Sequence, residues 1–137
     1  AVERAIEGCK ARGAKRALPL PVSVPSHCEL MRPAAERFAE SIAAINWQAP
    51  QIPLVQNVSA AVVSDLATLK ADLLAQLYSP VRWVESMVRL SEQGVTDLVE
   101  CGPGKVLGGL NKRCVKGINT YNLDTPEAFA AARAALA

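Results

Sequence analysis

The residue best suited to chemistry in this chain is its single histidine, His27, which follows the extended stretch ALPLPVSV of residues 17–24. A histidine can serve as a general base because imidazole exchanges protons near neutral pH. A lone histidine can also occupy a turn with no catalytic role. The sequence around it must therefore show whether a second reactive group is available.

No partner nucleophile for His27 is recognisable. The serines lie at positions 23, 26, 41, 59, 64, 79, 86 and 91, and none stands in the G-x-S-x-G sequence of a nucleophile elbow. Ser26 and Glu29 have the spacing of a capping box, which predicts His27 in the first turn of a helix. The positive end of that helix would favour a neutral imidazole that can accept a proton. Local sequence alone favours the structural interpretation.

The segment ECGPGKVLGGLNKR resembles a phosphate-binding turn, because a strand, a glycine turn and a helix N-terminus can together bind an anion. Its spacing fits neither nucleotide motif. Gly102 and Gly104 are one residue apart, and no Ser or Thr follows the lysine, as a phosphate loop requires. A dinucleotide fingerprint would need glycine where Leu107 stands. The simpler prediction is a tight turn in which Gly108 and Gly109 allow close helix packing on a sheet.

Composition excludes several classes of protein. The chain has 137 residues, half of them apolar, which is enough for one folded domain. The net charge of +2 arises from 15 basic and 13 acidic residues without a dense basic run, so nucleic-acid binding is not expected. No apolar run is long enough to cross a bilayer and no signal peptide is recognisable, which predicts a soluble, cytoplasmic protein without membrane contact.

The cysteines do not form a metal-binding pattern. Cys9, Cys28, Cys101 and Cys114 are widely spaced and contain no C-x-x-C pair. Zinc sites need ligands at short spacings, and a single histidine with isolated cysteines supplies none. We therefore expect reduced thiols, no metal site and no cofactor.

Apolar spacing predicts the elements that must position these residues. A helix opens the chain without a capping residue ahead of it, as if the chain starts mid-helix, and Gly13 would end it. The proline-rich residues 17–24 predict an edge strand or a crossing linker. Pro33 predicts either a new helix with proline in its first turn or a kinked helix. The remaining expected elements are helices over 31–46, 65–78, 80–94, 105–114 and 126 onward, and strands over 95–101 and 118–123. The short apolar run of residues 50–60 predicts a buried strand that leads into a loop at Gln56 and Asn57.

Strands and helices alternate from residue 52 onward, which predicts an α/β fold with a largely parallel sheet. Functional groups gather at the carboxyl ends of such strands, where His27 and Asn57 would lie. The leucine stripe of the 65–78 helix and a valine stripe that includes Val84 and Val88 are expected in the core. Arg82 and Trp83 fit equally well a cation beside an aromatic ring, or one solvated and one buried residue at a helix start.

Four motifs occur in a specific order: VSVPSHCELMRPAAERFA, NVSA, AQLYSPVRW and ECGPGKVLGGLNKR. In this order they closely resemble the C-terminal portion of the bacterial malonyl-CoA:acyl carrier protein transacylases, which are related to the acyltransferase domains of polyketide and fatty acid synthases. The resemblance covers essentially the whole chain. It implies a reaction of fatty acid synthesis in which a serine takes malonyl from coenzyme A and passes it to the carrier-protein thiol.

The resemblance also implies roles for individual residues. His27 matches the catalytic histidine of the family, and Gln76 matches the position whose main-chain carbonyl orients that imidazole. Asn57 matches an asparagine near the substrate site. The serine elbow, the arginine that binds the malonyl carboxylate and the oxyanion loop of the family all precede the matched region, so malonyl preference cannot be read here. This chain alone is therefore expected to be inactive without the N-terminal part of the same enzyme.

The implied fold has two parts. Residues 1–22 would be the end of a ferredoxin-like small subdomain, and residues 23–137 the C-terminal part of an α/β-hydrolase-like large subdomain. Two basic pairs, Lys15 with Arg16 and Lys112 with Arg113, could receive the acidic carrier protein if they share one surface. Two alternatives stay open: a non-enzymatic carrier-protein-binding piece, and the equivalent fragment of a polyketide acyltransferase.

Overall fold

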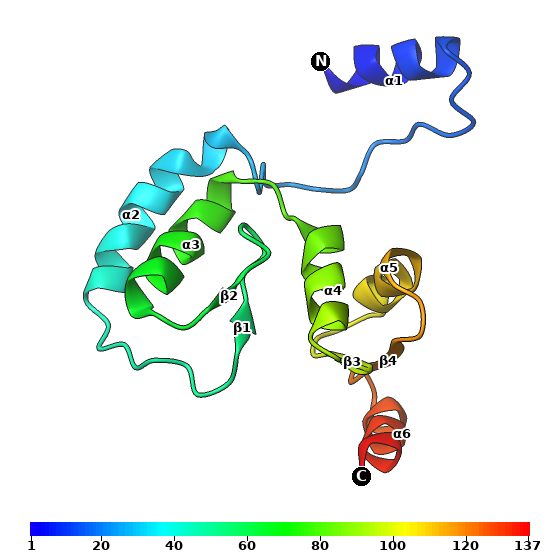
Figure 1. Ribbon diagram of the computed structural model, residues 1–137. Coiled ribbons are helices and arrows are strands. Elements are labelled where there is room, and N and C mark those ends of the chain that lie inside the picture. Colours follow the sequence, from blue (N-terminus) through cyan, green and yellow to red (C-terminus); the bar gives the residue numbers. More distant parts are fainter.

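The computed structural model describes all 137 residues as an α/β arrangement of helices with two small sheets (Figure 1). The predicted helices are present, with ends that differ by up to about three residues, within the usual uncertainty of sequence-based boundaries. The elements in order are α1 (Val2–Ala11), the 3₁₀-helix η1 (Glu29–Met31), α2 (Arg32–Ala43), β1 (Leu54–Val55), β2 (Val62–Val63), α3 (Leu66–Tyr78), α4 (Trp83–Glu92), β3 (Asp97–Glu100), α5 (Val106–Cys114), β4 (Asn119–Asn122) and α6 (Pro126–Leu136).

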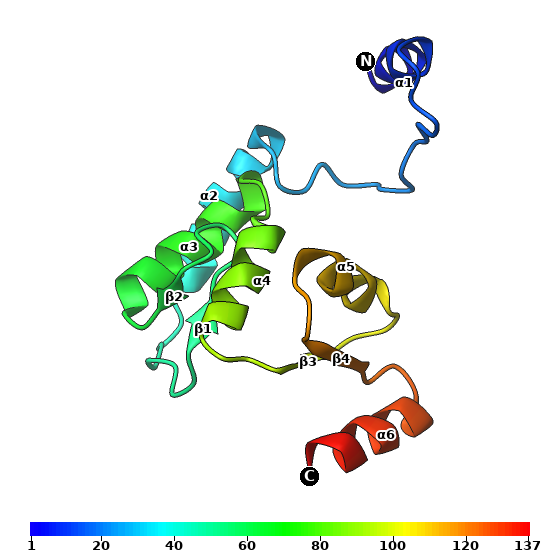
Figure 2. The same ribbon diagram turned by 45° about the vertical axis from the view of Figure 1, so that its right-hand side comes forward.

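Helix α1 lies apart from the rest of the molecule in both views of the ribbon (Figures 1 and 2). It has no buried residue, and the chain leaves it through Gly13 at a φ of +88°. Residues 14–25 form neither helix nor strand and are almost entirely exposed. Of the two predictions for the proline-rich stretch, the structure therefore shows the linker.

Helices α2 and α3 pack side by side and contribute three of the seven buried hydrophobic residues (Figures 1 and 2). Ala35 and Ile42 of α2 and Leu69 of α3 are buried there. Asp65 caps α3, because its carboxylate accepts a hydrogen bond from the Thr68 backbone N–H at 2.8 Å. That hydrogen bond also lowers the pKa of Asp65.

Pro33 lies in the first turn of α2, directly after η1. This is the first of the two arrangements that its sequence allowed, in which a short turn ends and a new helix begins. The missing proline N–H has no consequence there, since the first N–H groups of a helix lack intrahelical partners in any case.

The expectation of a largely parallel sheet was wrong for this chain. The strands form two separate two-stranded sheets, an antiparallel β1–β2 pair and a parallel β3–β4 pair. The strand predicted before Gln56 has only two residues, and the loop predicted at Gln56 and Asn57 is present. After this loop the chain forms β2, which the sequence pattern did not predict. A two-residue strand is too short for a period-2 pattern to be recognised.

Side-chain hydrogen bonds reinforce the parallel pair. Asp97 of β3 accepts hydrogen bonds from Asn119 Nδ2 at 2.9 Å and from the Tyr121 hydroxyl at 3.3 Å, both on β4. Together with the Thr96 hydroxyl, which lies at 2.6 Å and has the largest effect, these donors lower the pKa of Asp97. Desolvation and the Asp97 charge raise the pKa of Tyr121.

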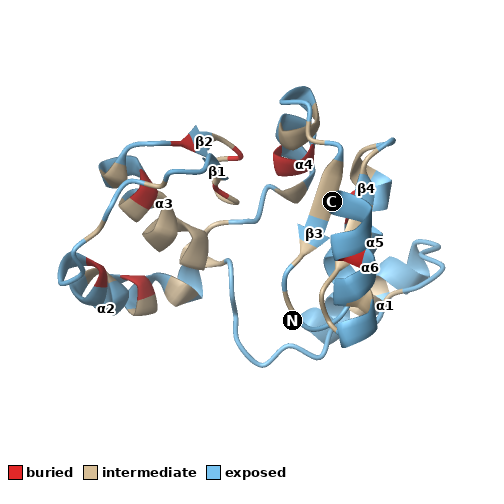
Figure 3. Ribbon diagram, turned by 90° about the horizontal axis from the view of Figure 1, so that it is seen from below, coloured by how far each residue is buried: buried red, intermediate tan, exposed pale blue.

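The buried core is small (Figure 3). Only 10 of 137 residues are buried, and no large side chain is completely enclosed. The valine stripe expected in the core was wrong, because Val84 and Val88 of α4 are 58% and 39% exposed. Nothing in this chain covers that face of α4, although its sequence pattern is that of a buried face. No helix of this structure is both long enough and apolar enough to cross a membrane.

Candidate functional site

His27 lies at the C-terminal end of α3. Its backbone N–H donates to the Leu77 carbonyl at 3.0 Å, and its ring Nδ1 lies 2.8 Å from the Gln76 carbonyl oxygen. The last four carbonyls of a helix lack partners within the helix, and His27 satisfies two of them. A carbonyl only accepts hydrogen bonds, so Nδ1 carries the proton and Nε2 is the nitrogen free to exchange a proton with another group.

The predicted placement of His27 in the first turn of a helix was wrong. Ser26 and Glu29 do not form a capping box: the N-cap of η1 is Cys28, without a side-chain bond. The Glu29 carboxylate instead binds Arg32 with both oxygens, at 2.7 and 2.8 Å. This side-chain hydrogen bond lowers the pKa of Glu29 and raises that of Arg32. A charged guanidinium outcompetes a backbone N–H for the carboxylate.

The expectation of a neutral imidazole at a helix N-terminus does not apply in the structure. The imidazole meets the carbonyl end of α3, not the N–H end of a helix. The contact therefore orients the ring, with Nδ1 toward the Gln76 carbonyl and Nε2 on the opposite side of the ring.

His27 adopts a left-handed backbone conformation with a φ of 62°. This conformation is uncommon outside glycine, with histidine and asparagine among the residues that enter it most readily. The two hydrogen bonds to α3 hold the turn in that state. Residues kept in such conformations by their surroundings cluster at functional sites.

Besides the contact between Gln76 and His27, a second hydrogen bond joins Gln76 to Asn57. Asn57 Nδ2 donates to Gln76 Oε1 at 2.9 Å, so Gln76 contacts His27 through its main chain and Asn57 through its side chain. Asn57 Oδ1 is buried without a partner. The structure thus brings together three predicted site residues from three separate segments of the chain.

Arg82, which the sequence allowed to be solvated or beside an aromatic ring, contacts the turn that carries Asn57. Its Nη1 donates to the Ser59 carbonyl at 2.9 Å, and its backbone N–H donates to the Asn57 carbonyl at 2.8 Å. Trp83, buried in one of these interpretations, is half-buried, and its Nε1 has no hydrogen-bond partner. The sequence contains no spacing signal that relates Arg82 to residues more than 20 positions earlier, so only the fold reveals this contact.

The glycine turn does not leave its helix end open for a phosphate. The Glu100 carboxylate accepts hydrogen bonds from the backbone N–H groups of Leu107 at 3.1 Å and Gly108 at 2.9 Å. An internal carboxylate therefore takes the place that an anion would occupy at the start of α5. A Cβ on Gly108 would lie 3.1 Å from Thr120 Cγ2, whereas one on Gly109 would meet nothing within 4 Å. Close packing was predicted correctly for Gly108 and wrongly for Gly109.

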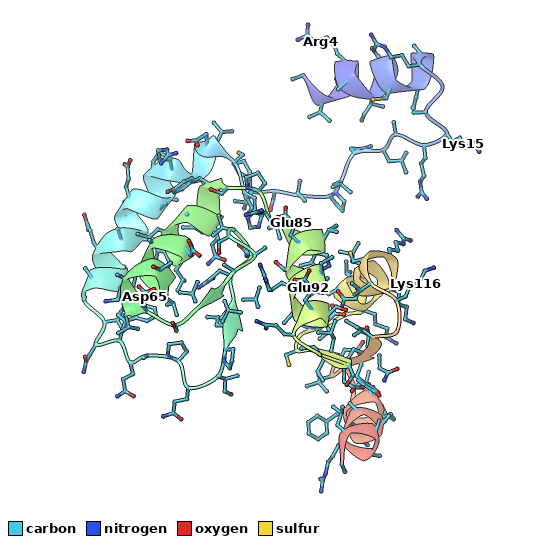
Figure 4. The ribbon with its side chains drawn as sticks, in the orientation of Figure 1. Arg4, Lys15, Asp65, Glu85, Glu92 and Lys116 are labelled. Atoms are coloured by element: carbon cyan, nitrogen blue, oxygen red, sulfur yellow. The ribbon has the colours of Figure 1, made fainter.

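The two basic pairs lie on separate segments. Lys112 and Arg113 belong to the last turn of α5, while Lys15 and Arg16 begin the linker after α1. Figure 4 shows Lys15 apart from α5. A single docking surface would therefore have to span the space between α1 and α5.

The titratable side chains form no group of three or more that could hold a metal ion. The four cysteines are unpaired. The His27 ring makes one hydrogen bond, to the Gln76 carbonyl, and this contact can orient an imidazole so that its other nitrogen exchanges a proton.

Comparison with known sequences relates the chain to longer proteins. No protein-family model matches it. The malonyl CoA-acyl carrier protein transacylase of Salmonella typhimurium is 52% identical over 132 residues, or 96% of this chain and 43% of that protein. The protein of the same name in Bacillus subtilis is 48% identical over 126 residues, or 92% of the chain and 40% of the relative.

Solved structures relate the chain to the same proteins. The malonyl-CoA:acyl carrier protein transacylase of Xanthomonas oryzae matches with a TM-score of 0.91 and 47% identity, covering 98% of this chain and 43% of that one. A malonyl-transacylase in complex with a type II polyketide synthase acyl-carrier protein matches with a TM-score of 0.87 and 46% identity, covering 96% and 42%. The chain spans less than half the length of these relatives. By sequence and by fold, it belongs to the malonyl-CoA:acyl carrier protein transacylase family and corresponds to the C-terminal part of its members.

Proposed function

We propose that the complete protein transfers malonyl from coenzyme A to the phosphopantetheine thiol of an acyl carrier protein, in the cytoplasm, as a step of fatty acid biosynthesis. The observation that carries this proposal is the 2.8 Å contact between His27 Nδ1 and the Gln76 carbonyl, in a chain 52% identical to a transacylase. In the neutral ring that contact places the proton on Nδ1 and leaves Nε2 available as a base.

The reaction requires two transfers. Nε2 of His27 takes the proton of a serine hydroxyl, the serine oxygen attacks the malonyl thioester, and the thiolate of coenzyme A leaves with the proton returned by His27. The carrier-protein thiol then loses its proton to Nε2 and attacks the serine ester. The bond between the malonyl carbon and the serine oxygen breaks, and the serine oxygen takes the proton back from His27. The Gln76 carbonyl keeps the Nδ1 proton in place throughout, and Asn57 holds the Gln76 side chain.

We assign the nucleophilic serine to the N-terminal part of the complete protein, since no serine of this chain lies in an elbow sequence. On this proposal residues 1–22 end a ferredoxin-like subdomain and residues 23–137 complete an α/β-hydrolase-like one. The exposed valine face of α4 would then be covered by the N-terminal part. The 137 residues alone would be inactive.

The complete protein, incubated with malonyl-CoA, should form a stable malonyl ester on one serine. Intact-mass spectrometry would detect the added malonyl group, and peptide mapping would locate the serine. Acetyl-CoA in a parallel incubation controls for acyl preference. If no serine becomes acylated by malonyl-CoA, the transacylase proposal is wrong.

Two rivals predict different results. A non-enzymatic piece would bind carrier protein without acylation, and a true start codon at Ala1 in the coding sequence would support it. If the chain is a fragment of a polyketide acyltransferase, the coding sequence upstream would contain a nucleophile-elbow sequence, and the complete enzyme could prefer another acyl group. The complex of a related malonyl-transacylase with a polyketide carrier protein keeps this second rival relevant. Acylation by several acyl-CoA donors in the same assay separates the two enzymes.

Charge reversal at Lys112 and Arg113 should raise the KM for acyl carrier protein by about tenfold, because an acidic partner would lose two attractive contacts. The hydrolysis of malonyl-CoA, which uses no carrier protein, should change little. A matched control reverses Arg37 and Arg133, exposed cations on α2 and α6, and leaves the same net charge. An equal rise in KM for both double variants would mean that net charge, not a docking surface, governs the association.

A further inference from the structure

The turn between β1 and β2, residues 56–61, is closed by its own backbone. The Gln56 N–H donates to the Ala61 carbonyl at 3.1 Å, and the Ala60 N–H donates to the Gln56 carbonyl at 2.8 Å. Ala60 is buried and adopts a left-handed φ of 53°. A buried alanine in this conformation indicates that contacts outside the turn stabilise it.

Two helices supply those contacts. From α3, Asp72 accepts a hydrogen bond from the Ser59 hydroxyl at 2.8 Å, and Gln76 accepts one from Asn57 Nδ2. From the start of α4, Arg82 donates its backbone N–H to the Asn57 carbonyl and its guanidinium to the Ser59 carbonyl. One residue thus binds two carbonyls of this turn: its backbone N–H binds that of Asn57 and its guanidinium binds that of Ser59.

Arg82 is also hydrogen-bonded to residues of α4. Its Nη2 donates to the Glu85 carboxylate, and its backbone carbonyl accepts a hydrogen bond from the Ser86 hydroxyl at 2.9 Å. The ion pair lowers the pKa of Glu85 and raises that of Arg82. The guanidinium thus bridges the first turn of α4 and the 56–61 turn with separate nitrogens, which its planar fork permits.

Helix α4 contains a second arginine–glutamate pair that can be compared with Arg82 and Glu85. Arg89 pairs with Glu92 at the same i, i+3 spacing as Arg82 pairs with Glu85, and the two arginine side chains are similarly exposed, at 51% and 47%. Both pairs border the same surface hollow of about 270 Å³, and Figure 4 labels Glu85 and Glu92 on α4. Only Arg82 donates to the 56–61 turn.

We infer that Arg82 is a positioning residue for His27, acting through Asn57 and Gln76. The inference rests on the proposed function of His27. The Gln76 carbonyl belongs to the last turn of α3, where carbonyls have no intrahelical partner and the helix end can fray. The Asn57 bond to the Gln76 side chain restrains that turn, and Arg82 restrains Asn57. Arg82 itself does not touch the imidazole.

Arg82→Met in the complete protein should slow single-turnover malonylation of the serine by about tenfold, because small misplacements of a catalytic group reduce the rate strongly. The KM for malonyl-CoA should stay within about twofold, since the inference gives Arg82 no contact with substrate. Arg89→Met is the matched control and should acylate at the unmodified rate. Arg82→Lys should acylate at a rate between those of Arg82→Met and the unmodified protein, because one ammonium cannot reproduce the two directions of the guanidinium fork.

A double-mutant cycle tests the route of the effect. If Arg82 acts through Asn57, Arg82→Met combined with Asn57→Ala should be no slower than Asn57→Ala alone. Multiplied effects would show that Arg82 acts by another route and would overturn the inference, as would equal rates for Arg82→Met and Arg89→Met. Rates are compared well below each variant's unfolding midpoint, so that lost stability is not mistaken for lost positioning.

The same assay separates this inference from the proposed function. If His27→Ala acylates normally, the role of His27 is wrong and the inference falls with it. If His27→Ala is slow while Arg82→Met matches Arg89→Met, the role of His27 stands and only the inference is overturned. Slow acylation in both His27→Ala and Arg82→Met, with non-additivity in the cycle, supports both.

Discussion

His27→Ala in the complete protein is expected to slow formation of the malonyl-serine ester by a factor of about 10² or more. The substitution removes the only ring nitrogen in this chain that can take the serine proton. Rapid-quench measurement of ester formation from malonyl-CoA reports this step directly, before transfer to the carrier protein begins.

Alanine at this position changes more than the base. It loses the bond from Nδ1 to the Gln76 carbonyl and must adopt the left-handed φ of 62°. His27→Asn is the better-matched control, because asparagine tolerates that conformation and its amide can donate to the same carbonyl. We expect His27→Asn to be as slow as His27→Ala and to unfold at a higher temperature. Ester formation at the unmodified rate in His27→Asn would mean that His27 only stabilises the turn.

Gly108→Leu should destabilise the complete protein by about 1–3 kcal/mol, the usual range for an overpacked contact. The new Cβ would lie 3.1 Å from Thr120 Cγ2 and 3.6 Å from Glu100 Oε2, the carboxylate that binds the first N–H groups of α5. The helix would have to move away from β4 or release Glu100. Urea unfolding followed by circular dichroism measures the change as a lower midpoint.

Gly109→Ala is the control for this prediction and should have the opposite sign. Its Cβ meets nothing within 4 Å, and alanine favours a helix over glycine by up to about 1 kcal/mol. A midpoint that falls for Gly109→Ala, or stays unchanged for Gly108→Leu, would contradict the packing of α5 on β4 described here.

Much of the local structure was predictable from sequence because its causes lie within a few residues. Pro33 lies in the first turn of α2, and Asp65 and Thr125 cap α3 and α6. These are contacts between a residue and the backbone within the next turn. The capping box at Ser26 failed for an equally local reason, since Arg32 lay within reach of Glu29 and bound it more strongly.

The apolar pattern of α4 shows a different limit. Val84 and Val88 have the spacing of a buried face, yet both are exposed in this chain. Periodicity reports that a face is suited to burial and does not report which segment covers it. The short β1–β2 pair was not predicted as a pair, because two-residue strands are too short to show a period-2 pattern.

The sequence by itself determined the helices to within about three residues at their ends, and the family to which the chain belongs, because these depend on local spacing and on ordered motifs. The ordered motifs implied a contact between His27 and the Gln76 carbonyl, but local chemistry placed His27 at a helix start. Only the tertiary structure showed that this contact lies at the C-terminal end of α3 and that Arg82 binds the turn of Asn57. Both contacts join residues 20 to 50 positions apart. Hydrogen bonds of that range depend on how the helices pack, and no local preference in the chain encodes them.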